Sequence, residues 1–114
     1  MNPVAVEDAI REVSNRIANG VTVCDTRYRA FLAADREYDA AFARAYMAHQ
    51  GAAHERRYAA EIATVKEREA RDVADAAYRY ADRQAKALEN ELRALQSVGA
   101  SIRAMYATAG VGER

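Results

Sequence analysis

The 114 residues suffice for one modest domain, and 28 of them are Ala, which favours long, closely packed helices over a globular core of large side chains. Seventeen basic residues balance seventeen acidic ones, so the chain lacks the basic excess of a protein that binds nucleic acid through its phosphates. One cysteine excludes an internal disulfide, and the sequence contains no apolar run of about 18 residues that would span a membrane.

The first eight residues lack the basic start and the apolar run of a signal peptide. The lone Cys24 is typical of a reducing compartment. We therefore expect a cytoplasmic protein, located in the host cytoplasm if a phage encodes it, with no membrane association.

The first predicted helix covers residues 4–49. Asn2 followed by Pro3 is a helix start, because an N-cap side chain precedes a proline at the first helical position. Apolar residues then recur at spacings of three and four. This predicted stripe comprises Val6, Ile10, Val13, Ile17, Val21, Cys24, Tyr28, Phe31, Asp35, Tyr38, Phe42, Ala45 and His49. Asn19-Gly20 leaves open a kink or short break at 19–22.

A turn is predicted at 50–52, where Gly51 is suited to end the first helix. A second helix is expected over 53–109, followed by a flexible tail at 110–114. Its early apolar stripe is Tyr58, Ile62 and Val65. Its late stripe is Ala81, Ala85, Leu88, Leu92, Leu95, Gly99, Ile102, Tyr106 and Ala109. A change of phase between the stripes, near Glu69–Val73, predicts a stutter.

These elements predict an all-α fold, a single domain made of one long antiparallel two-helix hairpin. With Gly51 at the turn, residues whose numbers add to about 104 should face each other. The expected pairs are Phe42 with Ile62, Tyr38 with Val65, Phe31 with Val73, Ile17 with Leu88, Val13 with Leu92, and Ile10 with Leu95. One hairpin buries little area, so we expect self-association into a helical bundle, as a dimer or a higher oligomer.

No group of residues predicts a metal, a cofactor or a catalytic site. His49, His54 and Glu55 flank the turn, but their spacing matches no metal motif, and turn chemistry explains them better. Asp35 is expected to face Glu69, either as an acid–base pair or, preferably, with both carboxylates pointing outward to Arg36, Lys66 or Arg68 where the packing slips. A polar position there would also fix the register. Cys24 lies far from either histidine and is expected to be a small buried side chain.

Seven tyrosines are many for a chain with two Phe and no Trp. Several fall on the predicted inner stripes, while others combine with arginines to form a candidate surface for a partner. That surface comprises Arg44, Tyr46, Tyr78, Arg79, Tyr80 and Arg83. Tyrosine and arginine dominate protein interfaces and also stack on single-stranded bases. The neutral charge favours a protein partner, with at most weak nucleic-acid binding.

Three segments carry a resemblance: residues 37–46, Gly51 with Glu55-Arg56, and residues 92–104. In them the sequence resembles a group of small helical proteins from double-stranded DNA phages of high-GC hosts. Such proteins are often encoded among recombination and replication genes, beside single-strand annealing and single-strand-binding proteins. The resemblance implies a setting rather than a mechanism. The turn departs from the group, which usually has Gly-Thr or Gly-Ser before Glu-Arg, because here Ala52-Ala53-His54 intervenes after Gly51 and the capping serine or threonine is missing.

The favoured hypothesis is a non-catalytic phage accessory protein that binds a protein partner in DNA recombination or replication. The alternatives are an inhibitor of a host nuclease or defence complex, and a virion or scaffold component. An enzyme is disfavoured, since the sequence contains no nucleophile–base constellation.

Overall fold

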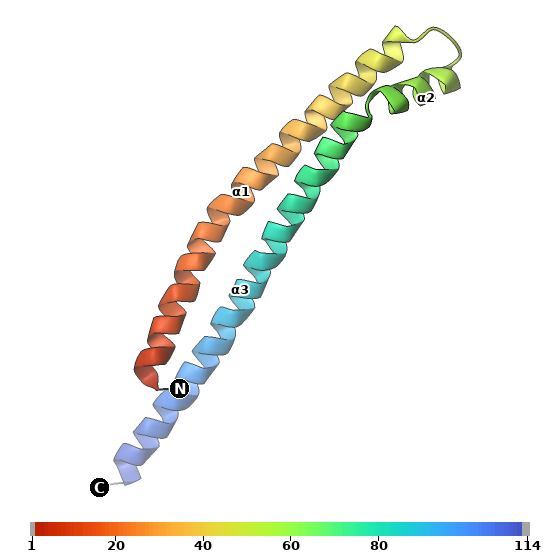
Figure 1. Ribbon diagram of the computed structural model, residues 1–114. Helices are drawn as coiled ribbons and strands as arrows, with labels where there is room; N and C mark the ends of the chain where they lie inside the picture. Colours follow the sequence, from red (N-terminus) through yellow and green to blue (C-terminus); the bar gives the residue numbers. More distant parts are fainter. Residues whose placement is uncertain (1, 113–114) are drawn as a thin grey trace. The chain divides into compact units, whose positions relative to one another are not determined.

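A computed structural model describes the backbone of residues 2–112 and the side chains of residues 2–109. The chain forms three helices, α1 (Pro3–Ala48), α2 (Ala53–Ala63) and α3 (Val65–Gly112) (Figure 1). Within residues 2–112, only Asn2, the turn at 49–52 and Thr64 lie outside a helix. The all-α helical hairpin predicted from the sequence is confirmed.

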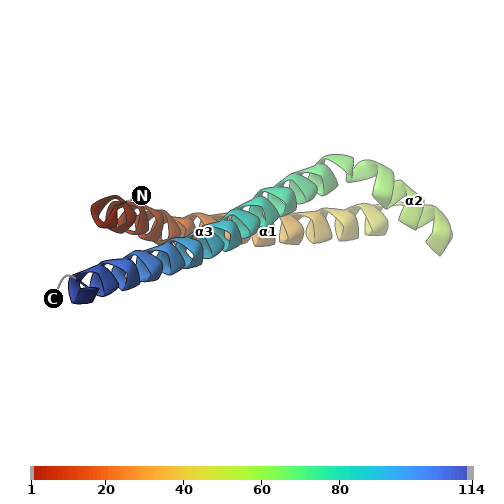
Figure 2. The same cartoon turned by 90° about the horizontal axis from the view of Figure 1, so that it is seen from below.

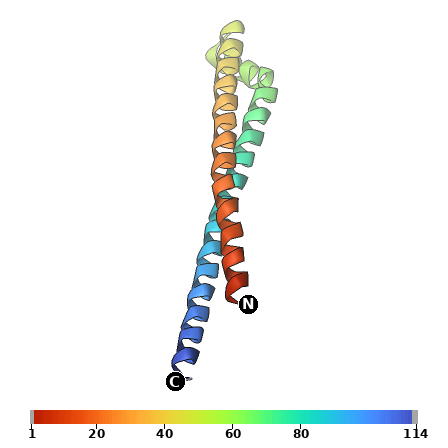
Figure 3. The same cartoon turned by 90° about the vertical axis from the view of Figure 1, so that its left-hand side faces the viewer.

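The helices form two compact units. Unit 1 contains Met1–Thr22 and Asp82–Arg114, and unit 2 contains Val23–Ala81. In unit 1 the first part of α1 lies antiparallel to the last part of α3, which continues past the start of α1 (Figure 3). In unit 2 the end of α1 packs beside α2 and the first part of α3.

Helix α1 begins as the sequence predicts. The Oδ1 of Asn2 accepts a hydrogen bond from the backbone N–H of Ala5 at 2.8 Å, and Pro3 takes the first helical position. The helix runs without interruption through Asn19-Gly20. The break considered at 19–22 is therefore absent, because a single glycine inside a long packed helix lowers its stability without ending it.

The turn at 49–52 centres on Gly51, as predicted. Its φ of 144° lies in a region that residues other than glycine rarely adopt. The guanidinium of Arg56 donates from Nε to the carbonyl oxygen of Gly51 at 3.0 Å, which satisfies one backbone acceptor of the turn. Gly51 thus reverses the chain, and the first turn of α2 holds the loop closed.

The second predicted helix is divided at Thr64, where α2 bends away from the line of α3 (Figure 2). Thr64 is buried, and its hydroxyl donates to the carbonyl oxygen of Ala60 at 2.6 Å. The same oxygen accepts the backbone N–H of Thr64 at 3.1 Å. Such back-bonding by a threonine side chain bends helices, so the prediction of one unbroken helix over 53–109 was wrong.

The far end of α3 also differs from the prediction. The helix continues to Gly112 and not only to Ala109. Residues 110–112, assigned to the flexible tail, belong to α3, while residues 113–114 of that tail lie outside the described residues.

The contact between helices in each unit follows one heptad pattern, here called the seam, and every seam residue is buried or half-buried. On α1 the seam comprises Val6, Ile10, Val13, Ile17, Gly20, Cys24, Arg27, Phe31, Ala34, Tyr38, Ala41 and Ala45. On α2 and α3 it comprises Ala60, Thr64, Glu67, Arg71, Ala74, Tyr78, Ala81, Ala85, Leu88, Leu92, Leu95, Gly99 and Ile102. The spacing alternates between four and three throughout, so the predicted stutter at 69–73 is absent.

Facing seam residues have numbers that add to about 105, close to the predicted 104. In unit 1 a Cβ built on Gly99 would lie 3.3 Å from Val6. The predicted pairs Ile17–Leu88, Val13–Leu92 and Ile10–Leu95 all fall on seam residues.

Near the turn, in unit 2, two of the predicted pairs were wrong. Ile62 and Val73 are exposed, so neither packs against the first helix as expected. Tyr38, predicted to face Val65, lies under the guanidinium of Arg71. On α2 and the first part of α3, small and charged residues fill much of the seam, while Ile62 and Val73 lie outside it.

None of the described helices combines the length and the apolar character needed to cross a membrane.

Two seam glycines give a matched test of this packing. A Cβ added at Gly20 meets no atom within 4 Å, whereas one added at Gly99 meets Val6, which is 2% exposed. We expect Gly20→Ala to raise the free energy of unfolding by about 1 kcal/mol through helix propensity. Gly99→Ala should show no gain, because the added methyl group would lie 3.3 Å from Val6, closer than an ordinary van der Waals contact. Denaturant unfolding of both variants checks this, and equal stabilisation would contradict the close approach at Gly99.

Candidate functional site

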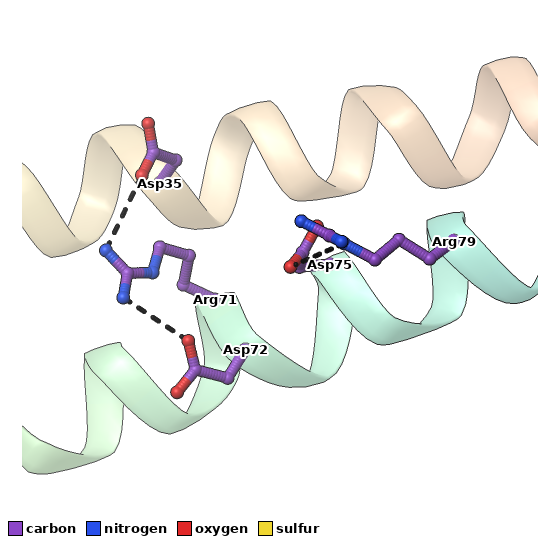
Figure 4. Close-up of polar contacts among 5 residues, drawn as sticks. All are labelled: Asp35, Arg71, Asp72, Asp75 and Arg79. Atoms are coloured by element: carbon purple, nitrogen blue, oxygen red, sulfur yellow. Dashed lines mark hydrogen bonds and ion pairs between the residues drawn. The ribbon is translucent and has the colours of Figure 1, made fainter.

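A charged cluster interrupts the seam of unit 2 around Arg71. Its guanidinium lies 4.0 Å from a carboxylate oxygen of Asp35 on α1 and 3.3 Å from one of Asp72 on its own helix (Figure 4). It also stacks over the ring of Tyr38, 4.5 Å from the ring centroid. The planar arginine thus joins a carboxylate and an aromatic face of the facing helix.

The predicted approach of Asp35 to Glu69 does not occur. Asp35 pairs with Arg71, and Glu69 is exposed. The two carboxylates therefore form no acid–base pair. One oxygen of Glu67 on the seam is buried and has no hydrogen-bond partner among the described residues. Such a group lowers stability, typically by about 1–3 kcal/mol.

Next to this cluster, Arg79 and Asp75 form an ion pair one helical turn apart (Figure 4). The Nε of Arg79 lies 3.1 Å from each carboxylate oxygen of Asp75. The arginine side chain is mostly exposed, so solvent screens the pair and its contribution to stability is small.

Tyrosines of the predicted partner surface take part in contacts within unit 2. Tyr78 is half-buried, and its ring centroid lies 5.0 Å from that of Tyr28 on α1. Beside them, Arg27 donates to the carbonyl oxygen of Ala77 at 3.2 Å. Tyr46 is also half-buried, with Arg56 6.0 Å from its ring centroid.

The remaining members of the predicted surface are exposed. Arg44 forms an ion pair with Glu37 at 3.6 Å, and Tyr80 is 54% exposed. Arg79 and Tyr80 belong to unit 2, whereas Arg83 belongs to unit 1. Tyr46 and Tyr78 are half-buried, so the exposed members of the predicted surface are Arg44, Arg79, Tyr80 and Arg83. Binding of a partner by its exposed members stays a prediction.

The histidines and the cysteine form no site together. His49 and His54 are both exposed at the turn, and Cys24 is a free, half-buried thiol on the seam. Among the described residues, no three histidine, cysteine, aspartate or glutamate side chains are grouped closely enough to hold a metal ion.

The main feature that the sequence analysis missed is an apolar strip on the outside of unit 2. Its five large side chains lie on α2 and α3, and we call them the outer strip. They are Tyr58 (56% exposed), Ile62 (77%), Val65 (37%), Val73 (70%) and Tyr80 (54%). The helical period places them opposite the buried seam residues Ala60, Thr64 and Ala81.

Unit 1 has a smaller apolar surface at the end of α3. Ile102 is the last seam residue before α3 passes the start of α1. Beyond it, Met105 and Tyr106 are exposed. These three residues and Ala109 line a hollow of about 240 Å³. We call these four residues the α3 end surface.

The sequence matches no protein-family profile, and no curated protein or solved structure is significantly similar to it.

Proposed function

We propose that this chain is a non-catalytic accessory protein that acts by binding another protein. The observation that supports this is the exposure of large apolar side chains in both units, on the outer strip and on the α3 end surface. Exposed apolar patches of this kind are typical of interaction sites on soluble proteins. Ile102, Tyr106 and Ala109 continue the heptad of the seam, and Met105 lies beside them, which gives a surface suited to an amphipathic helix of a partner.

The resemblance to small helical phage proteins supplies the setting of the proposal, DNA recombination or replication. Balanced charge supports a protein partner over nucleic acid, because the chain has no excess of cations to neutralise phosphates. Inhibition of a host nuclease or defence complex, and a role in a virion or scaffold, are the alternatives. The identity of the bound partner separates all three.

Photo-crosslinking from the α3 end surface tests the proposal. A photoreactive residue at Met105 should capture a defined protein in cells that express the chain from its natural locus, and mass spectrometry identifies it. The same residue at Glu89, an exposed polar position on α3, is the matched control and should capture nothing specific.

A titration with labelled DNA supplies the contrary outcome. Submicromolar binding of single-stranded DNA near physiological salt, with no protein captured from Met105, would contradict the proposal. It would indicate instead a protein that stacks bases on its tyrosines.

A further inference from the structure

The pattern of side chains along the outer strip is nearly symmetric about its midpoint. Its face contains positions 58, 62, 65, 69, 73, 76 and 80, whose spacing of 4, 3, 4, 4, 3 and 4 is symmetric about Glu69. Reversal of the strip about this residue exchanges Tyr58 with Tyr80 and Val65 with Val73. Ile62 exchanges with the small Ala76.

A strip that matches its own reverse fits an interface with two-fold symmetry, in which the same surface patch is used by both subunits. We propose that the outer strip binds the outer strip of a second copy of this chain, with the helices antiparallel and Glu69 on the two-fold axis. This inference rests on the proposed protein-binding function and names one partner.

The bend at Thr64 does not interrupt the period of the strip. The backbone N–H of Thr64 donates to Ala60, and that of Arg68 donates to the carbonyl oxygen of Thr64 at 3.0 Å. The seam also continues across the bend, with Ala60 and Thr64 buried and Glu67 half-buried at the heptad spacing. Tyr58 and Ile62 on α2 stay on the face that Val65 begins on α3.

Charged residues flank the strip. Lys66 and Asp72 lie on opposite flanks, so in an antiparallel pair they do not meet, and the Lys66 side chains of the two copies share one flank. The two Glu69 side chains approach each other at the axis, and Lys66 of the opposite copy lies one turn away. Neither Lys66 nor Glu69 forms an ion pair within the described chain. The chain has no net charge, so two copies carry no overall repulsion.

The area also suits a second copy. Side chains of this size and exposure leave roughly 500 Å² of apolar surface on each strip. Complete burial of both strips would remove about 1,000 Å² from water, which is the lower limit for a specific interface. The resulting dimer is one that dissociates on dilution, and a single charge placed in the strip should weaken it strongly.

Sedimentation of the full chain over a range of concentrations tests the dimer. The unaltered chain should reach twice its 12.6 kDa mass. Ile62→Glu should weaken association by about tenfold or more, because the charge enters the apolar contact. Glu69→Ala should strengthen it, because the like charges at the axis are removed. Val21→Glu, at an exposed apolar residue of unit 1, is the control and should associate as the unaltered chain does.

Cysteine crosslinking tests the direction of the helices in a Cys24→Ser background. Glu69→Cys should form a disulfide between copies, because the residue faces itself across the axis. Val65→Cys should not, because its equivalents are separated by about eight residues, or about 12 Å along the helix, beyond the reach of a disulfide. Efficient crosslinking of Val65→Cys would indicate parallel helices and overturn the proposal.

A chain that stays monomeric at all concentrations, or an Ile62→Glu variant that associates normally, would also overturn the proposal. The proposed function is judged separately by capture from Met105. Capture that persists in the Ile62→Glu variant shows that partner binding does not depend on the second copy. A dimer that captures no protein would instead contradict the proposed function and leave the self-association intact.

Discussion

Replacement of Val13 by aspartate should lower the free energy of unfolding by about 3 kcal/mol or more, enough to unfold much of unit 1 at room temperature. Val13 is 3% exposed on the seam of α1, and its facing position on α3 is Leu92. No described cation lies on the seam of unit 1 to pair with a buried carboxylate there.

Val21→Asp on the same helix is the matched control. Val21 is 67% exposed, so the same chemical change adds a charge where water already solvates the side chain. We expect a loss below about 1 kcal/mol, from helix propensity alone. Circular dichroism melts of the two variants check the contrast. Leu92→Asp should resemble Val13→Asp but cost less, because Leu92 is only half-buried. Similar melting of Val13→Asp and Val21→Asp would contradict the assignment of the seam.

Val21 also shows where the sequence was misleading. A spacing of three or four from Ile17 admits both Gly20 and Val21, and an apolar criterion selects the valine. The structure places Gly20 on the seam and exposes Val21. In unit 1 such an error has little effect, because large apolar residues such as Val13 and Leu92 occupy most seam positions and determine the face.

In unit 2 the apolar criterion selects the wrong face. Ile62 and Val73 are exposed, while Thr64, Glu67 and Arg71 occupy the seam. The available signal was the uninterrupted heptad that extends back from the late stripe to the turn. A search for large apolar residues misses this heptad, because the helices in this region meet largely through small side chains and a charged cluster. The outer strip was missed for the same reason, since four of its five residues had been assigned to the interior and only Tyr80 to an outer surface.

The break at Thr64 was beyond a sequence argument of this kind. Threonine occurs inside many helices, and the sequence does not show whether its hydroxyl points to solvent or bonds the carbonyl oxygen four residues back. The contacts of Tyr46 and Tyr78 are similar. A tyrosine lies at the surface or against a facing ring depending on which residues form the buried face, and a shift of one residue changes the answer. The Ala-rich segments of unit 2 do not define that face from the sequence.

Arg71 is the residue through which the charged cluster of unit 2 is best tested. Truncation to alanine removes the stack on Tyr38 and the ion pair with Asp35, and it leaves that carboxylate half-buried at the seam. We expect Arg71→Ala to lower the free energy of unfolding by about 1–2 kcal/mol. Arg71→Lys keeps the charge but loses the planar stack, so it should recover part of this loss and not all of it.

Arg79→Ala separates this effect from the general loss of a surface ion pair. Arg79 forms a closer ion pair than Arg71 does with Asp35, at 3.1 Å against 4.0 Å, yet its side chain is 71% exposed, compared with 30% for Arg71. If the ion-pair distance decided the loss of stability, Arg79→Ala would be the more destabilising substitution. If side-chain burial decides it, Arg71→Ala is. Because water screens an exposed pair, Arg79→Ala should cost less than about 0.5 kcal/mol. Denaturant unfolding of the three variants decides between the two rankings. A larger loss in Arg79→Ala than in Arg71→Ala would mean that the seam cluster contributes no more than a surface pair, and that the apolar and small seam residues alone hold the helices of unit 2 together.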